Sequence, residues 1–180
     1  CEWYAKKFIK KNKLTKFKID IKKQIRFLLT NLQLNEKVLV HRDFHVSNLM
    51  KYKNKIGVID SQDALIGNRA YDLASLIDDV RFRTDEIFKN KIYRYYLKLN
   101  KKRVNKATLL SDFEILSILR NMKIIGIFTR LAMRDKKKQY LKLIPYAWKL
   151  IELRISNNKK FFELKSLLEL NFSKKIRNQK

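Results

Sequence analysis

The chain has 180 residues, of which 46% are hydrophobic, and carries 43 Lys and Arg against 17 Asp and Glu, a formal charge of +26. This length and composition predict one globular domain with a real core and argue against a disordered chain. The single cysteine, Cys1, excludes an internal disulfide, so we expect a cytoplasmic protein. Charged and polar residues interrupt the most apolar stretch, residues 115–133, which argues against a membrane span.

The basic residues are spread along the whole chain, whereas the acidic residues are concentrated in one part. Clustered Lys and Arg would indicate binding to nucleic-acid or membrane phosphates. Residues 36–86 instead hold 9 of the 17 acidic and 8 of the 43 basic residues, a local charge of −1. We therefore expect no specific nucleic-acid recognition. A basic binder of nucleic acid or anionic membranes stays an alternative interpretation.

Hydrophobic periodicity predicts helices before residue 38. Residues 1–12 place large apolar side chains near one helical face, residues 13–18 form a basic connector, and residues 17–32 repeat apolar side chains at helical spacing. The chain begins on Cys and not on Met, so we do not expect a native N-terminus here.

Residues 38–63 form the only stretch whose polar residues are spaced for chemistry. Apolar runs at 38–40, 49–50 and 56–59 predict short buried strands with polar residues at their ends.

Three polar residues of this stretch, Asp43, Asn48 and Asp60, have the order of a kinase catalytic loop. Transfer of a γ-phosphoryl group needs a carboxylate that orients the attacking hydroxyl and accepts its proton, and Asp43 suits that role. It also needs oxygen ligands for the Mg²⁺ that accompanies ATP, and Asn48 and Asp60 suit that role. The alternative is that all three are ordinary turn and strand-end residues.

With this motif the chain resembles the aminoglycoside phosphotransferase family, small-molecule kinases related in fold to protein kinases. His41, Asp43 and Asn48 fall on its H-x-D-x-x-x-x-N signature, and Asp60 falls on its second metal-binding Asp. Residues 71–74, YDLA, fall on the start of its downstream helix.

Within the family, residues 41–50, 57–64 and 124–145 are most similar to the bacterial cell-wall amino-sugar kinases. Those enzymes phosphorylate the anomeric hydroxyl of N-acetylmuramate or N-acetylglucosamine. The resemblance implies a sugar kinase that uses ATP and Mg²⁺ and takes a small-molecule sugar as its partner. One departure is Ser61, where those kinases usually carry Phe or Trp, so the packing that would orient Asp60 is missing.

The resemblance also implies supporting residues. His41 holds the loop backbone, and Asp72, in the first turn of the predicted helix, helps to hold the catalytic loop in place. His45 lies two residues past Asp43 and either contacts the nucleotide phosphates or the sugar, or stabilises the loop. Residues expected to face the sugar are Gln62, Asp63 and Arg120. The alternatives are that Asp63 belongs to a turn and that Arg120 is paired or faces solvent.

After residue 85 the sequence predicts only helices joined by polar loops. Ser111 or Asp112 is expected to cap a long central helix. Residues 174–180 are expected to form a frayed basic tail. The predicted helical ranges are 87–99, 113–128, 139–155 and 160–170, with a basic loop over 101–106.

Together these patterns predict an α+β, mostly helical chain. Residues 1–173 would form the C-terminal lobe of a protein-kinase-like fold, with a short β-hairpin that carries the catalytic and metal loops. Such kinases also have a β-rich N-terminal lobe with a glycine-rich phosphate-covering loop. The three glycines, Gly57, Gly67 and Gly126, are too scattered for that loop. We therefore expect the N-terminal lobe to be missing and the chain alone to be inactive. A non-catalytic kinase remnant or pseudokinase that binds a partner is the alternative.

Overall fold

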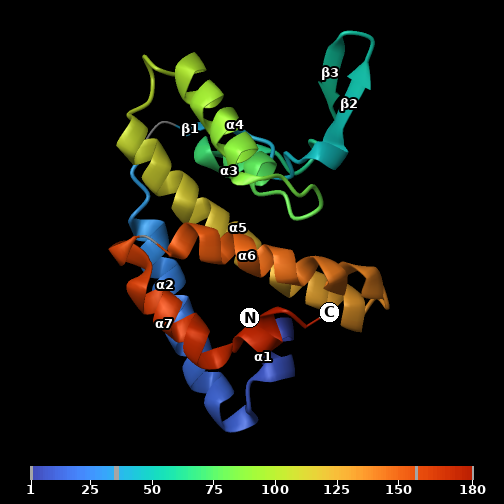
Figure 1. Ribbon diagram of the computed structural model, residues 1–180, viewed down its shortest axis with the longest axis vertical. Helices are drawn as coiled ribbons and strands as arrows, with labels where there is room; N and C mark the ends of the chain where they lie inside the picture. The colour runs from blue at the N-terminus through green and yellow to red at the C-terminus, as the bar shows by residue number, and fades with distance from the viewer. Residues whose placement is uncertain (1, 35–36, 157, 180) are drawn as a thin grey trace. The chain divides into compact units, whose positions relative to one another are not determined.

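The computed structural model describes residues 2–34, 37–156 and 158–179. This part of the chain is mostly helical and contains two small two-stranded sheets, so the α+β description holds (Figure 1). The chain divides into two compact units. Leu32–Ser117 is called the mixed unit here, and Cys1–Asn31 with Ile118–Lys180 the helical unit.

The mixed unit contains two antiparallel strand pairs. β1 (Lys37–Val40) pairs with β4 (Leu65–Asn68), and β2 (Leu49–Tyr52) pairs with β3 (Lys55–Val58). The three predicted strands are therefore present. β4 was not predicted, because a glycine and an asparagine cut short its apolar run, and both residue types are depleted in strands.

Two helices and part of a third complete the mixed unit. α3 (Ala70–Ile77) and α4 (Glu86–Leu99) follow β4, and α5 (Lys106–Met133) contributes its residues up to Ser117. The buried core of the unit consists of Ala70, Leu73, Ala74, Ile77, Leu109, Phe113 and Leu116.

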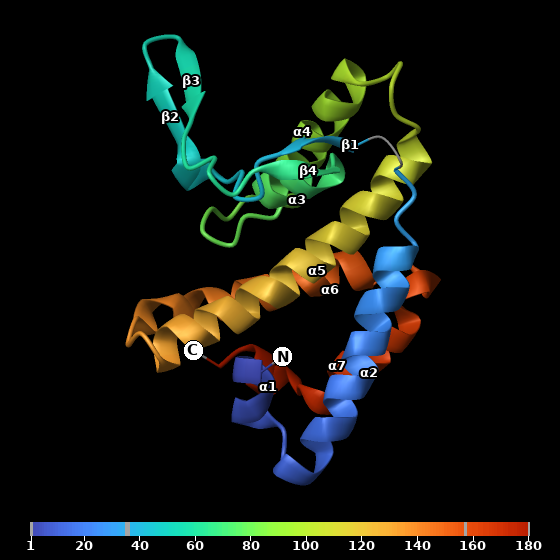
Figure 2. The ribbon, with the colours of Figure 1, turned by 180° about the vertical axis from the view of Figure 1, so that it is seen from behind.

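The β2–β3 hairpin is more exposed than the sequence predicted. Both ribbon views show it extending away from α3 and α4 (Figures 1 and 2). Met50, Tyr52 and Ile56 are 56%, 70% and 62% exposed. The expectation of buried strands was wrong here, because apolar content alone does not show whether a second layer covers a strand.

Only part of the apolar stripe predicted on α4 packs against the core. Ile92 and Tyr96 pack against the core cluster together with Tyr93 and Leu97, whereas Ile87 and Leu99 are 82% and 66% exposed. A helical period shows which residues share a face, but it does not show how much of that face a neighbouring layer covers.

Helix α5 begins earlier than predicted. The Oδ1 atom of Asn105 accepts hydrogen bonds from the backbone N–H groups of Ala107 and Thr108, at 2.9 and 3.1 Å, and caps the helix. Ser111 and Asp112, the predicted caps, therefore lie inside the helix. Within the described ranges, no helix is long and apolar enough to cross a membrane, α5 included.

A buried ion pair joins the helices of the mixed unit. Lys89 on α4 lies 3.3 Å from Asp78 at the C-terminal end of α3, and both side chains are at most 5% exposed. Lys89 also donates to the backbone carbonyl of Ile77, and Ser117 on α5 donates to Asp78. The buried charges are thus compensated by one another and by hydrogen bonds.

The helical unit contains the remaining helices. The basic connector predicted over residues 13–18 lies inside α2, where Lys13 and Lys16 occupy the exposed side of an amphipathic helix. The elements are α1 (Glu2–Phe8), α2 (Lys11–Thr30), the rest of α5, η2 (Lys138–Leu143), α6 (Ile144–Ile155), η3 (Lys159–Phe161), α7 (Phe162–Asn171) and α8 (Lys174–Arg177).

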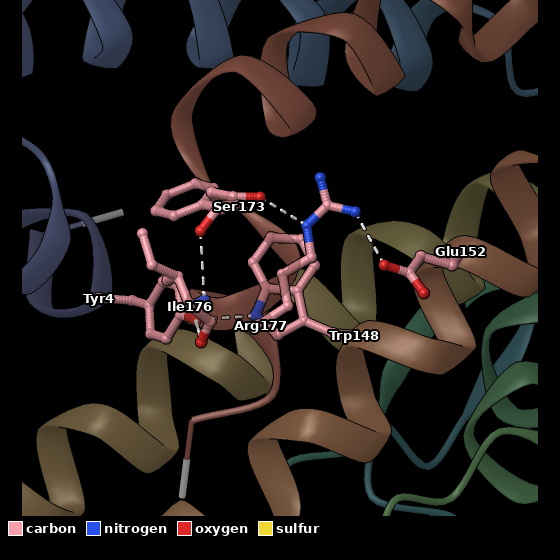
Figure 3. A network of polar contacts seen from close by, with 7 residues as sticks. Tyr4, Trp148, Glu152, Ser173, Ile176 and Arg177 are labelled. Atoms are coloured by element: carbon pink, nitrogen blue, oxygen red, sulfur yellow. Dashed lines mark hydrogen bonds and ion pairs between the residues drawn. The ribbon is translucent and has the colours of Figure 1, made fainter.

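Residues 174–177 form helix α8 and not the frayed tail that the sequence predicted. Arg177 is 7% exposed, and it donates hydrogen bonds to the carbonyl of Phe172 and to Glu152 Oε1, each at 2.8 Å (Figure 3). Its guanidinium also lies over the ring of Trp148, 5.2 Å from the ring centre. These contacts anchor the end of the chain to α6.

Candidate active site

The loop after β1 starts at His41 and ends with the 3-10 turn η1 (Val46–Asn48). Asp72, in the first turn of α3, accepts hydrogen bonds from the backbone N–H groups of His41 at 2.7 Å and Arg42 at 3.0 Å. Arg42 has a φ of 73°, a left-handed conformation that is costly for any residue other than glycine. Asp72 therefore supports a loop conformation that the backbone alone disfavours.

The carbonyl oxygen of Asp43 is the internal anchor of this loop. It accepts hydrogen bonds from His45 N at 3.0 Å and from Asn48 Nδ2 at 2.9 Å. Because a carbonyl only accepts, Asn48 turns its Nδ2 toward Asp43, and its Oδ1 is left for another partner. His45 and Asn48 are 8% and 9% exposed, whereas Asp43 is exposed. Hydrogen bonds within the loop thus fix its backbone, while the Asp43 carboxylate, which would act on a substrate, stays accessible.

Ile59 connects the loop to the hairpin. The antiparallel register of β2 and β3 puts Asn48 opposite Ile59, and Ile59 N donates to the Asn48 carbonyl at 3.1 Å. The Ile59 carbonyl accepts from Nε2 of His41 at 3.0 Å, so that nitrogen carries a proton. Asp60 directly follows this doubly held residue. The two hydrogen bonds therefore fix Asp60 at the same end of the hairpin as Asn48.

Asp60 also has a left-handed backbone, with a φ of 69°. Its Oδ1 accepts a hydrogen bond from Gln62 Nε2 at 2.6 Å. The carbonyl of Ser61 accepts from Ala64 N at 3.0 Å and closes a turn. Gln62 therefore orients the Asp60 carboxylate by a hydrogen bond.

The remaining predicted residues are placed differently. The carbonyl of Asp63 accepts a hydrogen bond from Arg42 Nη1 at 3.3 Å, so its backbone supports the loop while Asp63 itself is exposed. Arg120 belongs to the helical unit, where it is 5% exposed on α5. The mixed unit thus gathers the other predicted site residues on one loop, one hairpin end and the start of α3, without Arg120.

Asn48 and Asp60 are the residues whose chemistry fits a metal ion. Both carry hard oxygen donors, and the hairpin register brings them to one end of the same two strands. Mg²⁺ usually takes one or two such ligands from the protein and completes its shell with phosphate oxygens and water. Within the described ranges, no group of three or more His, Cys, Asp or Glu is placed to hold a metal. One carboxylate and one amide match the small number of protein ligands that Mg²⁺ usually takes.

Two residues at the end of the β1–β4 pair away from the loop have contacts that the sequence analysis missed. Asp112 on α5 is fully buried and accepts hydrogen bonds from Gln33 N, Leu34 N and Asn68 Nδ2 at 2.9, 2.9 and 2.7 Å. Asn68 in turn accepts from Ala70 N at 2.9 Å and starts α3. An Asn before a helix is a recognisable signal. Asp112 carries no such signal, because its partners are distant in sequence.

Comparison with known proteins gives the family. Residues 10–120 match the sequence model of the phosphotransferase enzyme family. The chain belongs to this family. The resemblance expected from the motif is therefore confirmed, and the match begins well before the motif residues that carried it.

The similar relatives include three proteins named N-acetylmuramate/N-acetylglucosamine kinase. That of Neisseria meningitidis serogroup B is 35% identical over 149 residues, which cover 80% of this chain and 45% of that protein. That of Pseudomonas aeruginosa is 32% identical over 152 residues, 81% of this chain and 45% of that protein. That of Caulobacter vibrioides is 31% identical over 116 residues, which cover 62% of this chain and 32% of that protein. The chain spans about half the length of the first two relatives.

Proposed function

We propose that the mixed unit is the catalytic part of an ATP-dependent kinase that phosphorylates a sugar hydroxyl. One observation carries the proposal. Ile59 is held by Asn48 through its N–H and by His41 through its carbonyl, which joins the loop of Asp43 to the position of Asp60. A kinase needs its acceptor-orienting acid and its metal ligands in one rigid frame.

In the proposed reaction, the acceptor oxygen attacks the γ-phosphorus of ATP. A bond forms between that oxygen and phosphorus, the bond from phosphorus to the β–γ bridging oxygen breaks, and ADP leaves. Asp43 orients the hydroxyl and takes its proton on the carboxylate. Its exposure and the fixed position of its carbonyl suit this role, because the acid is open to a substrate while its backbone is held.

Asn48 Oδ1 and the Asp60 carboxylate would hold the Mg²⁺. When bound, the ion neutralises charge that develops on the phosphate oxygens. The structural roles fall to His41, through its contact with Ile59, and to Asp72, through the loop backbone. The low exposure of His45 favours loop support over direct phosphate contact.

For the acceptor, we propose the anomeric hydroxyl of N-acetylmuramate or N-acetylglucosamine, in cell-wall recycling. The names of the relatives support this choice. Gln62 and Asp63 are proposed to border the sugar, since both are exposed and directly follow Asp60. For Arg120, the resemblance alone supports a role in binding the sugar.

Kinases of this type cover the bound nucleotide with a separate lobe, and the described residues ahead of β1 do not resemble that lobe. Residues 2–34 form helices α1 and α2 and the turn after them, whereas kinases of this type cover ATP with a β-rich lobe. We therefore propose that the 180-residue chain alone binds ATP·Mg²⁺ weakly and transfers no phosphate. Saturable, tight ATP binding in titration calorimetry would contradict this.

The test of function uses a chimera. The sequence that precedes the matched region in the Neisseria meningitidis relative is fused ahead of this chain. We expect it to convert N-acetylmuramate and N-acetylglucosamine to acid-labile 1-phosphates in the presence of ATP and Mg²⁺. An aminoglycoside serves as control acceptor. Phosphorylation of the aminoglycoside alone would contradict the sugar. No transfer to any acceptor by a folded chimera that binds ATP would favour a non-catalytic kinase remnant.

A further inference from the structure

The buried carboxylate of Asp112 has no role in the proposed reaction and lies at the far end of the β1–β4 pair from the His41 loop. Lys37 pairs with Asn68 at one end of this ladder, and Val40 pairs with Leu65 at the other. Asp112 contacts Asn68, so it sits behind the first end. His41 follows Val40 at the second.

Asp112 joins two segments that are separate in sequence. One oxygen accepts the N–H of Gln33, and the other accepts the N–H of Leu34 and the side-chain amide of Asn68. A fully buried carboxylate is costly without such partners, and three donors to a charged acceptor compensate for that cost. The carboxylate therefore fixes the approach to β1 against the end of β4.

Asn68 passes this constraint to α3. Its Nδ2 donates to Asp112, while its Oδ1 accepts the N–H of Ala70, the first residue of α3. Asp72 follows two residues later and accepts the N–H groups of His41 and Arg42. Hydrogen bonds of 2.7 and 2.9 Å thus link Asp112 to the start of α3, and hydrogen bonds of 2.7 and 3.0 Å link Asp72 in the same helix to the loop.

We infer that Asp112 and Asn68 are positioning residues that set the catalytic loop by fixing the β4–α3 corner and, through it, Asp72. The term catalytic loop rests on the proposed function, but the relay itself does not. Without the bond from Asn68 to Asp112, the start of α3 is free to shift against β1. The two hydrogen bonds of Asp72 to the loop then weaken, although neither relay residue touches the site.

The test measures hydrogen exchange at the His41 and Arg42 amides in the 180-residue chain, by NMR. Asp112→Asn keeps the shape and removes one charged acceptor. Asn68→Asp keeps the oxygen that starts α3 but replaces the donor to Asp112 by a like charge. We expect both to speed exchange at the two amides roughly tenfold or more, because a hydrogen bond to a charged group is involved.

Asn105→Ala is the matched control, because it removes the cap of the same helix α5 without touching the relay. It should destabilise the unit by about 1 kcal/mol and leave the rates at His41 and Arg42 unchanged relative to other amides of the unit. If Asn68→Asp matched the wild type, Asn68 would only start α3, and the relay would be refuted. Equal relative rates in Asp112→Asn and Asn105→Ala would also refute it.

Activity gives a second readout. In the chimera, Asn68→Asp should lower kcat with little change in KM for ATP or sugar, since the loop is misplaced and the binding groups remain. Should Asp112→Asn fail to fold, Asn68→Asp decides the question. The exchange result stands whether or not the chimera phosphorylates a sugar, so failure of the relay and failure of the function are distinguishable.

Discussion

Asp72 accepts the backbone N–H of Arg42 at 3.0 Å, and Arg42 holds a left-handed φ of 73°. A strained backbone of this kind costs about 1–3 kcal/mol and persists only where its surroundings impose it. A hydrogen bond to a charged acceptor contributes about 1.5–3 kcal/mol. The two magnitudes are similar, so the carboxylate is sufficient to hold the strained start of the loop.

Asp72→Asn should therefore damage activity through position and not through binding. The Asn side chain has one acceptor oxygen in place of two, so it can hold only one of the His41 and Arg42 N–H groups well. In the chimera we expect kcat to fall roughly 10²-fold, the effect of a displacement of about 1 Å, with KM for ATP little changed. Asp85→Asn is the control. Asp85 caps α4, and because Asn is also a good N-cap residue, this variant should keep nearly wild-type kcat. A fall in ATP affinity equal to that in kcat would contradict the positioning role.

Substitutions of the two exposed acids, Asp43 and Asp60, should differ in their effect on nucleotide binding. Asp43→Asn should lower kcat by roughly 10²–10⁴-fold and leave ATP affinity nearly unchanged, because its carboxylate acts on the acceptor hydroxyl. Asp60→Asn should lower both, since it removes a carboxylate ligand of Mg²⁺. Steady-state rates and ATP titrations of the chimera measure the difference. Equal rates for Asp43→Asn and the wild type would remove Asp43 from the reaction.

Gln62 should matter through Asp60. Its amide donates to Asp60 Oδ1 at 2.6 Å, so Gln62→Leu frees that carboxylate to turn. We expect the Mg²⁺ concentration for half-maximal rate to rise roughly tenfold, the loss of about one hydrogen bond to a charged group. Ser61→Trp in the same variant should restore part of the affinity, since it supplies packing in place of the hydrogen bond. Unchanged Mg²⁺ dependence in Gln62→Leu would mean that the contact does not orient a metal ligand.

The scattered basic residues of the chain should bind nucleic acid without sequence selectivity. Each phosphate neutralised by Lys or Arg adds nearly one unit to the slope of log K against log salt, so binding by scattered basic residues is lost at a few hundred millimolar salt. Filter binding with two unrelated duplexes at increasing salt measures this. Selective binding that survives this ionic strength would favour the nucleic-acid interpretation over the kinase.

The residues that could be predicted from the sequence are those that lie on a recognisable motif. His41, Asp43 and Asn48 lie on one loop, and the apolar runs that follow set the hairpin whose register adds Asp60. Asp112 could not be predicted, because Gln33 and Asn68 reach it only after the chain has folded. A helix position with a polar residue gives no sign of such distant partners.

Exposure was predicted less well than secondary structure. The hairpin strands and the stripe of α4 were expected to be buried, yet Tyr52 and Ile87 are 70% and 82% exposed. Periodicity shows which residues share a face, but the presence of a covering layer depends on the whole fold. The basic composition of residues 174–177 likewise predicted a frayed end, but the buried contacts of Arg177 hold them in a helix.

The ends of the chain meet at Tyr4, whose hydroxyl accepts from Trp148 Nε1 at 2.9 Å and donates to the carbonyl of Ile176 at 3.3 Å (Figure 3). Burial raises the pKa of Tyr4 to about 12, and the Trp148 hydrogen bond opposes this rise only in part. In the unfolded chain a tyrosine ionises near pH 10.

The helical unit should therefore lose stability as the pH rises from about 10 to about 12, because the unfolded state releases the Tyr4 proton first. Below pH 10 the contribution is fully present. Tyr4→Phe should lower stability at pH 8 by about 1 kcal/mol through lost hydrogen bonds, and should flatten the decline above pH 10. Urea unfolding at each pH measures this, followed by tryptophan fluorescence, since both tryptophans, Trp3 and Trp148, belong to the helical unit. Tyr52→Phe in the exposed hairpin is the control and should keep the wild-type slope. If Tyr4→Phe declined as steeply as the wild type, the Tyr4 hydroxyl would not be protected from ionisation, and its contacts with Trp148 and Ile176 would not join the two ends of the chain.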